Sequence, residues 1–375
     1  MKIDRRRLVV LGAAGAASAL GPPILRAAAP PPKAAGDDLP AREASWYKKL
    51  EEGRVECELC PQKCTVADME RGMCGNRENR GGTYYTLVHG RACAVHVDPI
   101  EKKPFFHVMP GEQALSYSTA GCNVECKFCQ NWEISQFRPE QVEAYDLPPR
   151  ALVAAAKRTG ARLTAATYGE PVVFWEYVRG VATAANAAGL KPTVVSNGFI
   201  QEQPLREVVP SLAAIKIDLK GFREKYYEEQ IRGKLEPVLK TLEVIHELGV
   251  WLEIVVLLVP TLNDSAEEIR DLSQWVYKTL GPDVPVHFTR FHPTYRLTDL
   301  PPTPVATLER SWKIGREAGL NYVYLGNVPG HPGENTVCPG CGEILVRRVG
   351  FRVITNDLKN GACPECKRKI PGVWE

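Results

Sequence analysis

Short apolar runs alternate with segments of helical periodicity through the middle of the chain. The runs that read as strands lie at 114–118, 163–167, 193–196, 213–219, 251–258 and 284–289. Most are followed by stretches in which apolar residues recur every three or four positions, as on an amphipathic helix. Parallel strands joined by crossover helices produce this alternation. The pattern predicts six strand–helix units, and a further short strand is expected at 322–325.

The helix ends agree with this pattern. The segment through 152–157 stops at Gly160 and the segment through 241–248 stops at Gly249, because glycine adopts the left-handed conformation that ends many helices. Asp264 and Ser265 can cap the next helix, because their side-chain oxygens can accept hydrogen bonds from its first backbone N–H groups. Such a sheet would form part of a barrel whose functional loops follow the carboxyl ends of the strands.

Composition limits the partners that need to be considered. The chain has 375 residues, of which 44% are hydrophobic and 24% charged, with a formal net charge of +3. This length supports one large core with one or two smaller satellites. No long basic stripe with interleaved aromatic residues is present, so nothing indicates a nucleic-acid partner.

The first thirty residues read as a targeting segment. Three arginines at 5–7 precede an Ala- and Gly-rich apolar stretch that ends near 26–29, the pattern of a twin-arginine export signal with a small-residue cleavage site. The apolar stretch is interrupted at 21–23 and is too short for a stable membrane span. Residues 1–45 are therefore predicted to be a signal and a linker.

Three cysteines follow the first predicted strand with the spacing C-x3-C-x2-C: Cys122, Cys126 and Cys129. Each iron of a [4Fe-4S] cluster needs a terminal ligand, usually a thiolate, so three local cysteines leave one iron open. The amino and carboxylate groups of S-adenosylmethionine can chelate such an iron. A zinc knuckle would need a second, distant ligand pair, and an odd local count does not suit a disulfide framework.

This spacing, with Phe128 directly before the last cysteine, resembles the signature of the radical SAM superfamily. The resemblance implies reductive cleavage of S-adenosylmethionine to methionine and a 5'-deoxyadenosyl radical that abstracts hydrogen from a substrate. It also implies an electron donor such as flavodoxin or ferredoxin. The expected fold is α/β, with a partial (β/α)6 radical SAM barrel over 113–330.

The turn after the second predicted strand contains Gly169 and Glu170. Glycine lets the backbone approach a ligand, and a carboxylate can accept a hydrogen bond from an ammonium group. The turn resembles the Gly-Gly-Glu-Pro motif that binds the methionine amino group in this superfamily. Tyr168 stands in place of the first glycine.

Later strand ends supply further candidate contacts to the cosubstrate. Ser196 and Asn197 resemble the Thr-Asn-Gly segment of glycyl-radical activases, and Asp218 and Lys220 match the Asp-x-Lys pattern of those enzymes. Strand alternation puts Asp218 and Lys220 on one face, where a structural ion pair is the alternative. His292 sits like a ribose-contacting histidine in the activases, although a purely structural role is equally open.

Two further cysteine sets flank the predicted barrel. In the N-terminal Cys-rich region, 46–112, the spacing C-x2-C-x3-C-x9-C is formed by Cys57, Cys60, Cys64 and Cys74. Four thiols this close bind a metal in a reducing environment. Zinc is favoured because four ligands close its coordination sphere, and an auxiliary iron–sulfur cluster that relays electrons is the alternative.

The C-terminal region, 331–375, contains two C-x2-C pairs formed by Cys338, Cys341, Cys363 and Cys366. This is the spacing of a zinc ribbon or a rubredoxin-like module. Structural zinc is expected, with a rubredoxin-type iron as the alternative. Cys93 is left over and is expected to act as a small buried hydrophobe.

Residues from about 50 to 375 resemble the radical SAM proteins of the AmmeMemoRadiSam system, relatives of the pyruvate formate-lyase activating enzymes. The resemblance is carried by the cluster loop and by the segments at 57–61, 98–104, 217–220 and 324–331. It implies a genomic association with Memo-like and AMMECR1-like proteins. The substrate is not implied.

The sequence therefore predicts a radical SAM enzyme with an unknown substrate. Two alternatives stay open: an activase that generates a glycyl radical on a protein partner, and a non-catalytic metal carrier or electron-transfer protein. The export-type signal indicates the periplasm, whereas supply of the cosubstrate favours the cytoplasm.

Overall fold

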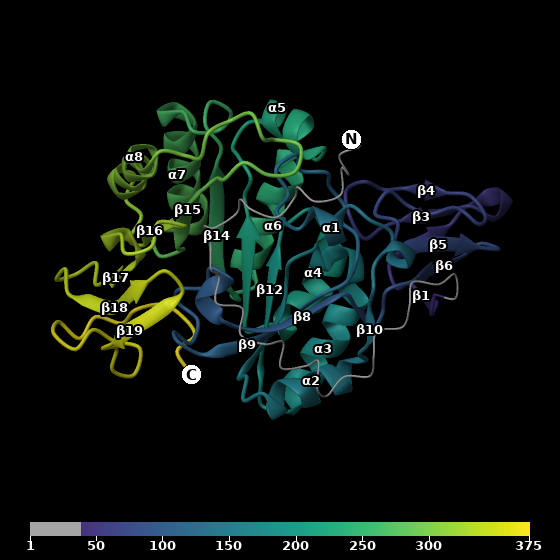
Figure 1. The fold of residues 1–375 in the computed structure, drawn as a ribbon, viewed down its shortest axis with the longest axis horizontal. Helices are drawn as coiled ribbons and strands as arrows, with labels where there is room; N and C mark the ends of the chain where they lie inside the picture. The colour runs from purple at the N-terminus through teal and green to yellow at the C-terminus, as the bar shows by residue number, and fades with distance from the viewer. Residues whose placement is uncertain (1–38) are drawn as a thin grey trace, which may run out of the picture.

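The computed structural model describes residues 39–375, so the predicted export signal lies outside the described residues. At the centre is an eight-stranded sheet of order β16-β15-β14-β13-β12-β11-β9-β8, in which all strands except β8 run parallel (Figure 1). Its strands are β8 (Ala94–Pro99), β9 (Gln113–Ser118), β11 (Leu163–Ala166), β12 (Lys191–Ser196), β13 (Ala214–Asp218), β14 (Trp251–Leu258), β15 (Val286–Arg290) and β16 (Val323–Gly326).

The predicted succession of strands and helices is confirmed. Helices connect neighbouring parallel strands throughout: α2 (Pro149–Arg158), α3 (Trp175–Ala187), α4 (Glu202–Val208), α6 (Leu235–Glu247), α7 (Ala266–Leu280) and α8 (Val305–Glu317). Gly160 and Gly249 adopt positive φ after their helices. Ser265 caps α7, because its Oγ accepts a hydrogen bond from the Glu268 amide at 3.2 Å.

One strand of the sheet was not predicted. β8 lies before the expected start of the barrel at residue 113 and pairs antiparallel with β9, placing Val95 opposite Tyr117. The central sheet therefore begins inside the region that the sequence assigned to the Cys-rich extension.

The remaining N-terminal extension forms two small antiparallel sheets, of order β2-β3-β4 and β1-β6-β5. A buried ion pair fixes it to the barrel helices: Arg77 Nη1 donates to Glu176 Oε1 on α3 at 2.9 Å. The strands are β1 (Arg42–Glu43), β2 (Tyr47–Lys49), β3 (Val55–Cys57), β4 (Thr65–Val66), β5 (Arg77–Arg80) and β6 (Thr83–Thr86).

Short elements complete the connections. β7 (Arg91–Ala92) pairs with β10 (Tyr145–Asp146). The other short helical elements are α1 (Trp132–Ser135), α5 (Glu224–Tyr226), the π-helix η6 (Tyr227–Ile231), and the 3-10 turns η1 (Glu51–Gly53), η2 (Ile100–Lys102), η3 (Pro139–Gln141), η4 (Pro171–Phe174), η5 (Val209–Ser211) and η7 (Pro332–Glu334). No helix in the described part of the chain is long and apolar enough to cross a membrane.

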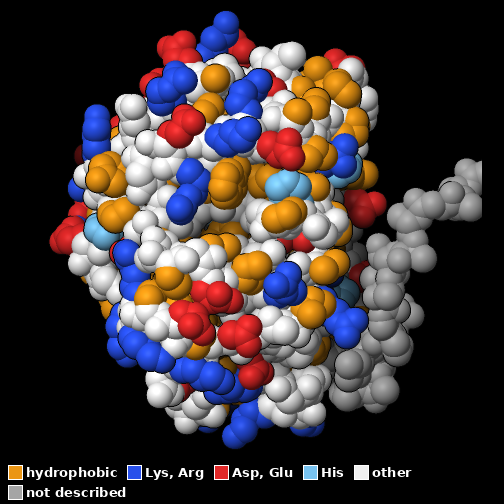
Figure 2. Space-filling model, turned by 90° about the vertical axis from the view of Figure 1, so that its left-hand side faces the viewer, with side chains coloured by type: hydrophobic (Ala, Val, Ile, Leu, Met, Phe, Trp, Pro, Cys, Tyr) orange, Lys and Arg blue, Asp and Glu red, His pale blue; other side chains and the backbone are white. Residues whose placement is uncertain are grey.

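The C-terminal module is a three-stranded antiparallel sheet of β17 (Thr336–Val337), β18 (Ile344–Val349) and β19 (Arg352–Asn356). Arg348, which is buried, fixes the module to the barrel by donating from Nη2 to the Phe106 carbonyl at 2.7 Å. The chain end returns alongside, where Val373 bridges to Val108. Figure 2 shows hydrophobic, basic and acidic side chains intermixed on the face seen from this side.

Candidate functional site

A cavity of about 410 Å³ lies at the carboxyl ends of the parallel strands. This volume falls within the ~300–1,000 Å³ typical of small-molecule sites. Side chains at or just beyond the ends of successive strands line it, among them Glu170, Asn197, Lys220, Thr289 and Asn327. The parallel arrangement brings these distant segments to one edge, as the sequence predicted.

The loop after β9 brings Cys122, Cys126 and Cys129 to this cavity. Cys126 is buried and the other two are partly exposed. Cys129 Sγ lies 3.1 Å from Ser135 Oγ, and Cys122 Sγ lies 4.0 Å from Asn197 Nδ2. All three thiols therefore face the same space.

The environment of the three thiols suits a metal cluster. Burial raises the pKa of Cys122 above its usual range and that of Cys126 to about 12. A bound cation favours the thiolate, so metal loading would release protons from these groups. Three thiols beside an open cavity fit a [4Fe-4S] cluster that retains one iron for another ligand.

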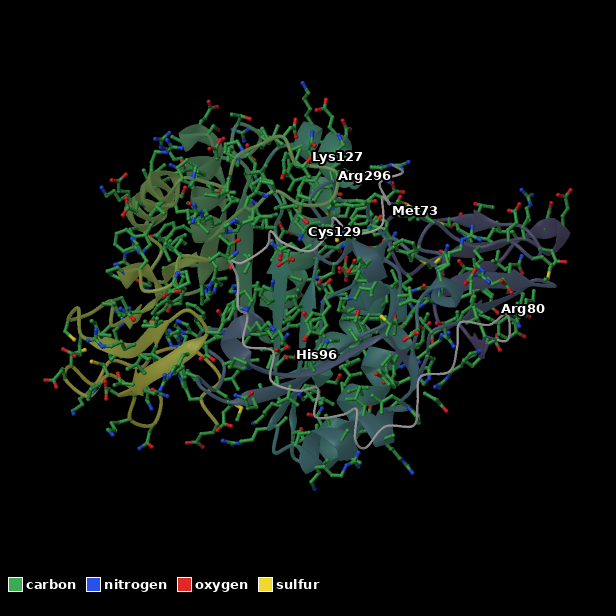
Figure 3. All side chains as sticks on the ribbon, in the orientation of Figure 1. Met73, Arg80, His96, Lys127, Cys129 and Arg296 are labelled. Atoms are coloured by element: carbon green, nitrogen blue, oxygen red, sulfur yellow. The ribbon has the colours of Figure 1, made fainter. Side chains whose placement is uncertain are left out.

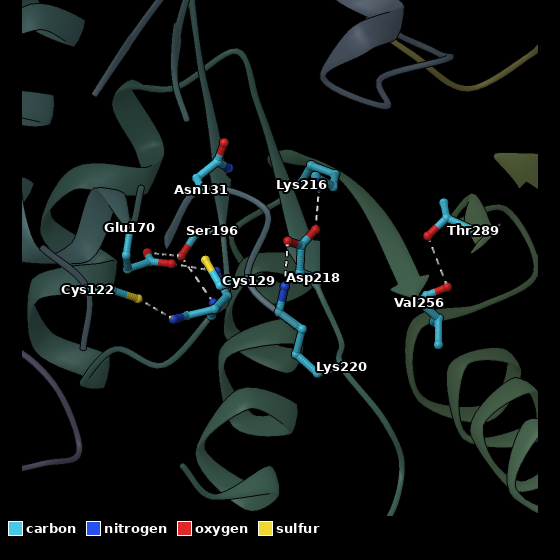
Figure 4. Close-up of polar contacts among 12 residues, drawn as sticks. Cys122, Cys129, Asn131, Glu170, Ser196, Lys216, Asp218, Lys220, Val256 and Thr289 are labelled. Carbon is cyan, nitrogen blue, oxygen red and sulfur yellow. Dashed lines mark hydrogen bonds and ion pairs between the residues drawn. The ribbon is translucent and has the colours of Figure 1, made fainter. Parts of the chain in front are cut away.

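Glu170 is held by three hydrogen bonds at the cavity wall, and Figure 4 shows its contact with Ser196. Ser196 Oγ donates to Oε1 at 2.6 Å, the backbone N–H of Asn197 donates to Oε2 at 2.8 Å, and the backbone N–H of Val172 donates to Oε1 at 3.0 Å. Burial raises the pKa of Glu170 to about 7, against the effect of these donors. The carboxylate can therefore gain or lose a proton near neutral pH.

The glycine at 169 is required by close packing. A Cβ there would lie 2.8 Å from Ser118 Oγ and 3.1 Å from the Thr119 carbonyl oxygen. The preceding Tyr168 adopts a φ of 69°, which normally favours glycine. Its hydroxyl donates to Asp98 on β8 and accepts from Lys103 Nζ at 3.0 Å. Contacts of the tyrosine side chain with β8 and with Lys103, the residue after η2, thus accompany the departure from the resembled motif.

Asp218 lies between two lysines at the end of β13. Lys220 Nζ is 2.8 Å from Asp218 Oδ2, and Lys216 forms a second ion pair with the same carboxylate (Figure 4). Burial opposes ionisation of Asp218, but the two lysines hold its pKa below the usual range. All three line the cavity.

Sequence reasoning did not select Lys216 or Lys103 as cavity residues. Lys216 is a charged residue within an apolar strand, two positions from Asp218, and that spacing alone could have revealed its orientation. Lys103 Nζ pairs with Asp98 Oδ2 at 2.6 Å. Burial lowers the pKa of Lys103 to about 8, against the attraction of Asp98.

The structure does not bring His292 together with the other predicted cosubstrate residues. Its side chain is exposed and is not part of the cavity lining. By contrast, Gly169, Glu170, Ser196, Asn197, Asp218 and Lys220 all line the cavity.

The C-terminal cysteines form a compact four-thiol cluster. The ligand atoms of Cys338, Cys341, Cys363 and Cys366 all lie within 4.8 Å of one another. Cys338 and Cys366 are 3.5 Å apart, and Cys341 and Cys363 are 3.6 Å apart. Tetrahedral coordination with metal–sulfur bonds of about 2.3 Å places sulfurs ~3.8 Å apart, so the cluster fits one metal ion.

The N-terminal cysteines meet in a different arrangement. Cys57, Cys60, Cys64 and Cys74 line one small internal cavity beside the cluster loop. Leftover Cys93 is partly buried, and burial raises its pKa to about 12.

Comparison with known proteins agrees with the geometry of the site. Residues 116–274 match the Radical SAM superfamily. The chain is 41% identical over 331 residues to the "Uncharacterized protein MJ0808" of Methanocaldococcus jannaschii, covering 88% of this chain and 98% of that protein.

Two solved structures show a more distant likeness. A domain of the pyruvate-formate lyase-activating enzyme from Bacteroides vulgatus is 15% identical, with a TM-score of 0.40, over 44% of this chain and 98% of that chain. A radical SAM methyltransferase from Sphaerobacter thermophilus is 14% identical, with a TM-score of 0.46, over 79% of this chain and 81% of that chain.

Proposed function

Because this chain belongs to the family of the archaeal protein MJ0808 and contains a Radical SAM superfamily domain, we propose that the cavity binds S-adenosylmethionine against a [4Fe-4S] cluster. Cys122, Cys126 and Cys129 are the proposed ligands. The observation that carries the proposal is that these three thiols and Glu170 line one cavity. The central sheet would then be the partial (β/α)6 barrel expected for such a site.

A cluster held by Cys122, Cys126 and Cys129 would supply the electron for cleavage of S-adenosylmethionine to methionine and a 5'-deoxyadenosyl radical. The residues of the chain bind and orient the cosubstrate. Glu170 would accept a hydrogen bond from the methionine amino group, since a charged acceptor binds such a donor strongly. Ser196 and the Asn197 amide hold that carboxylate in place.

Besides Glu170, Asp218 and several lysines line the cavity. Lys216 and Lys220 flank Asp218, and Lys103 pairs with Asp98. We assign Asp218 and Lys220 to the cosubstrate and the two more deeply buried lysines to an anionic group of the substrate. A cation in a site of low dielectric attracts an anion more strongly than it would in water.

The C-terminal module supplies part of the cavity mouth. Phe351, in the turn between β18 and β19, lines the cavity although its side chain is about half exposed (48%). An apolar side chain at the mouth limits access of water, which would otherwise quench a reactive radical. This role connects the C-terminal metal site, proposed to hold structural zinc, with the reaction.

The Radical SAM superfamily domain supports an enzyme rather than a non-catalytic carrier. Association with Memo-like and AMMECR1-like proteins, and dependence on a flavodoxin- or ferredoxin-type donor, are retained as proposals.

Cosubstrate binding tests the assignment. The full chain is reconstituted with iron and sulfide without oxygen, and binding of labelled S-adenosylmethionine is measured beside Cys122→Ala and Glu170→Gln. The parent should bind it, Glu170→Gln should keep its iron but bind weakly, and Cys122→Ala should lose the open-iron site. Equal binding by all three proteins would overturn the proposal.

A further inference from the structure

The N-terminal thiols are more widely spaced than the C-terminal ones. Among residues 39–375, the only group of three or more candidate ligands whose atoms all lie within 4.8 Å of one another is the C-terminal set. Cys57, Cys60, Cys64 and Cys74 nevertheless line one cavity, and Gly72 approaches Cys64 closely enough that a Cβ would lie 3.5 Å from its Sγ. The four thiols thus surround a common space without touching.

This spacing is too wide for one tetrahedral metal ion. Zinc with bonds of about 2.3 Å draws its four sulfurs to ~3.8 Å from one another and leaves no space between them. The cavity that these cysteines line has a volume of about 20 Å³. This open space is that of about one or two water molecules, so it is the separation of the four sulfurs that argues against a single tetrahedral ion.

A buried cation without a full set of partners faces the same cavity. Arg77 lines it, and its Nε is buried and has no hydrogen-bond partner. Its Nη atoms are occupied by Glu176. An N–H donor and a positive charge beside four thiolates would stabilise a cluster that carries negative charge, since hydrogen bonds to sulfur tune such clusters.

The N-terminal cavity adjoins the first cluster site. Asn123, the neighbour of Cys122, lines it, and Gln62 Nε2 donates to the Asn123 carbonyl at 3.0 Å. A larger cavity of about 570 Å³ is lined by both Cys74 and Cys122. Figure 3 places the labelled Met73, next to Cys74 in the chain, where the extension meets the barrel, and the labelled Cys129 over the barrel itself.

We propose that Cys57, Cys60, Cys64 and Cys74 hold a second, fully ligated [4Fe-4S] cluster that passes single electrons to the cluster on Cys122, Cys126 and Cys129. The electron comes from a low-potential one-electron donor protein. The second cluster is reduced by one electron and reoxidised when that electron moves on, with no bond made or broken. The destination of the electron rests on the proposed function, whereas the presence of the cluster does not.

The test for the cluster removes the first site. The full-length variant Cys122→Ala, Cys126→Ala, Cys129→Ala is purified and reconstituted without oxygen, and iron, acid-labile sulfide and zinc are measured. About four sulfides per chain should remain, with the electron paramagnetic resonance of a reduced [4Fe-4S] cluster. A rubredoxin-type iron in the C-terminal module would contribute no sulfide. Zinc beyond that of the C-terminal module, with no sulfide, would overturn the proposal.

A fourth substitution locates that cluster. Adding Cys64→Ser, at a partly exposed thiol, should remove the sulfide and the resonance signal, whereas adding Cys93→Ala should leave both unchanged. Circular dichroism shows whether each protein is folded. If Cys64→Ser unfolds the chain, Arg77→Lys provides a second measurement, since it should shift the reduction potential of the cluster. An unchanged potential in that variant would contradict the placement.

The relay is tested separately in the chain that keeps the first site. With Cys64→Ser, formation of 5'-deoxyadenosine driven by dithionite should persist, whereas formation driven by reduced flavodoxin should fall to the rate without donor. Equal rates with both reductants would overturn the relay. Absence of product from the parent with either reductant would instead count against the proposed function and leave the cluster result standing.

Discussion

Asn197 Nδ2 donates a hydrogen bond of 2.9 Å to Asn123 Oδ1. This contact joins the end of β12 to the loop that carries the three cluster cysteines. The backbone N–H of Asn197 also donates to Glu170, the carboxylate proposed to bind the cosubstrate. The cluster loop and Glu170 therefore belong to one hydrogen-bonded network. The geometry of cluster and cosubstrate is therefore set jointly.

Asn197→Ala should weaken cosubstrate binding while sparing the cluster. The variant leaves Asn123 Oδ1 without this donor, and loss of a buried hydrogen bond costs about 1–2 kcal/mol of stability. Because the cluster loop is then held less firmly against Glu170, we expect Kd to rise by up to about tenfold. Iron content and binding of S-adenosylmethionine are measured together. Asn186→Ala, at an exposed asparagine of α3 that donates to the Ser211 carbonyl, is the control and should bind like the parent.

Cosubstrate affinity should depend on the protonation of Glu170. Its pKa is raised to about 7 by burial, and only the ionised carboxylate can accept hydrogen bonds with both oxygens. Affinity should therefore fall as the pH drops below about 7, by about tenfold per pH unit well below that value. Glu170→Gln should bind weakly and lose this dependence. Parallel pH profiles for the two proteins would contradict the assignment.

The buried pair between the extension and the barrel should be important for stability. Glu176→Gln keeps the shape of the side chain but leaves the Arg77 charge uncompensated, and breaking a buried pair costs about 3–5 kcal/mol. The free energy of unfolding is measured by denaturant titration. Glu247→Gln removes the exposed partner of Arg206 and should change stability little. Equal losses of unfolding free energy in Glu176→Gln and Glu247→Gln would contradict a special contribution of the buried pair.

Removal of the C-terminal metal should loosen β17–β19. Cys341→Ser deletes one ligand of the four-thiol cluster, and a site of this kind stabilises its fold through the metal. We expect loss of one metal ion per chain and faster proteolysis within 331–375, with the iron of the first cluster retained. Cys93→Ala is the matched control. If the metal is lost and the rate of proteolysis does not change, the metal does not stabilise the fold of this module.

The local signals in the sequence were enough for much of this account. The strands were predicted from apolar runs, because parallel strands buried on both faces read as continuous hydrophobic segments. The cluster cysteines were predicted from spacing alone. Gly169 was singled out because a glycine permits close approach, and the 2.8 Å distance between its hypothetical Cβ and Ser118 Oγ confirms the crowding.

Other features depend on contacts that no local pattern encodes. The antiparallel addition of β8 is fixed by its pairing with β9, and the position of Phe351 depends on how the C-terminal module packs against the barrel. His292 was selected by resemblance in its loop, but the loop leaves it exposed. Lys216 is the exception, because its two-residue spacing from Asp218 puts both side chains on one face of the strand and was readable from the sequence.

The central claim is that a cluster held by the three thiols cleaves S-adenosylmethionine that is bound in the cavity beside Glu170. The most direct measurement is mass-spectrometric quantification of 5'-deoxyadenosine after oxygen-free incubation with cosubstrate and dithionite, in the parent and in Cys122→Ala. The account predicts product from the parent alone. Absence of product from a parent that holds a verified cluster and bound cosubstrate, or equal product from both proteins, would contradict it.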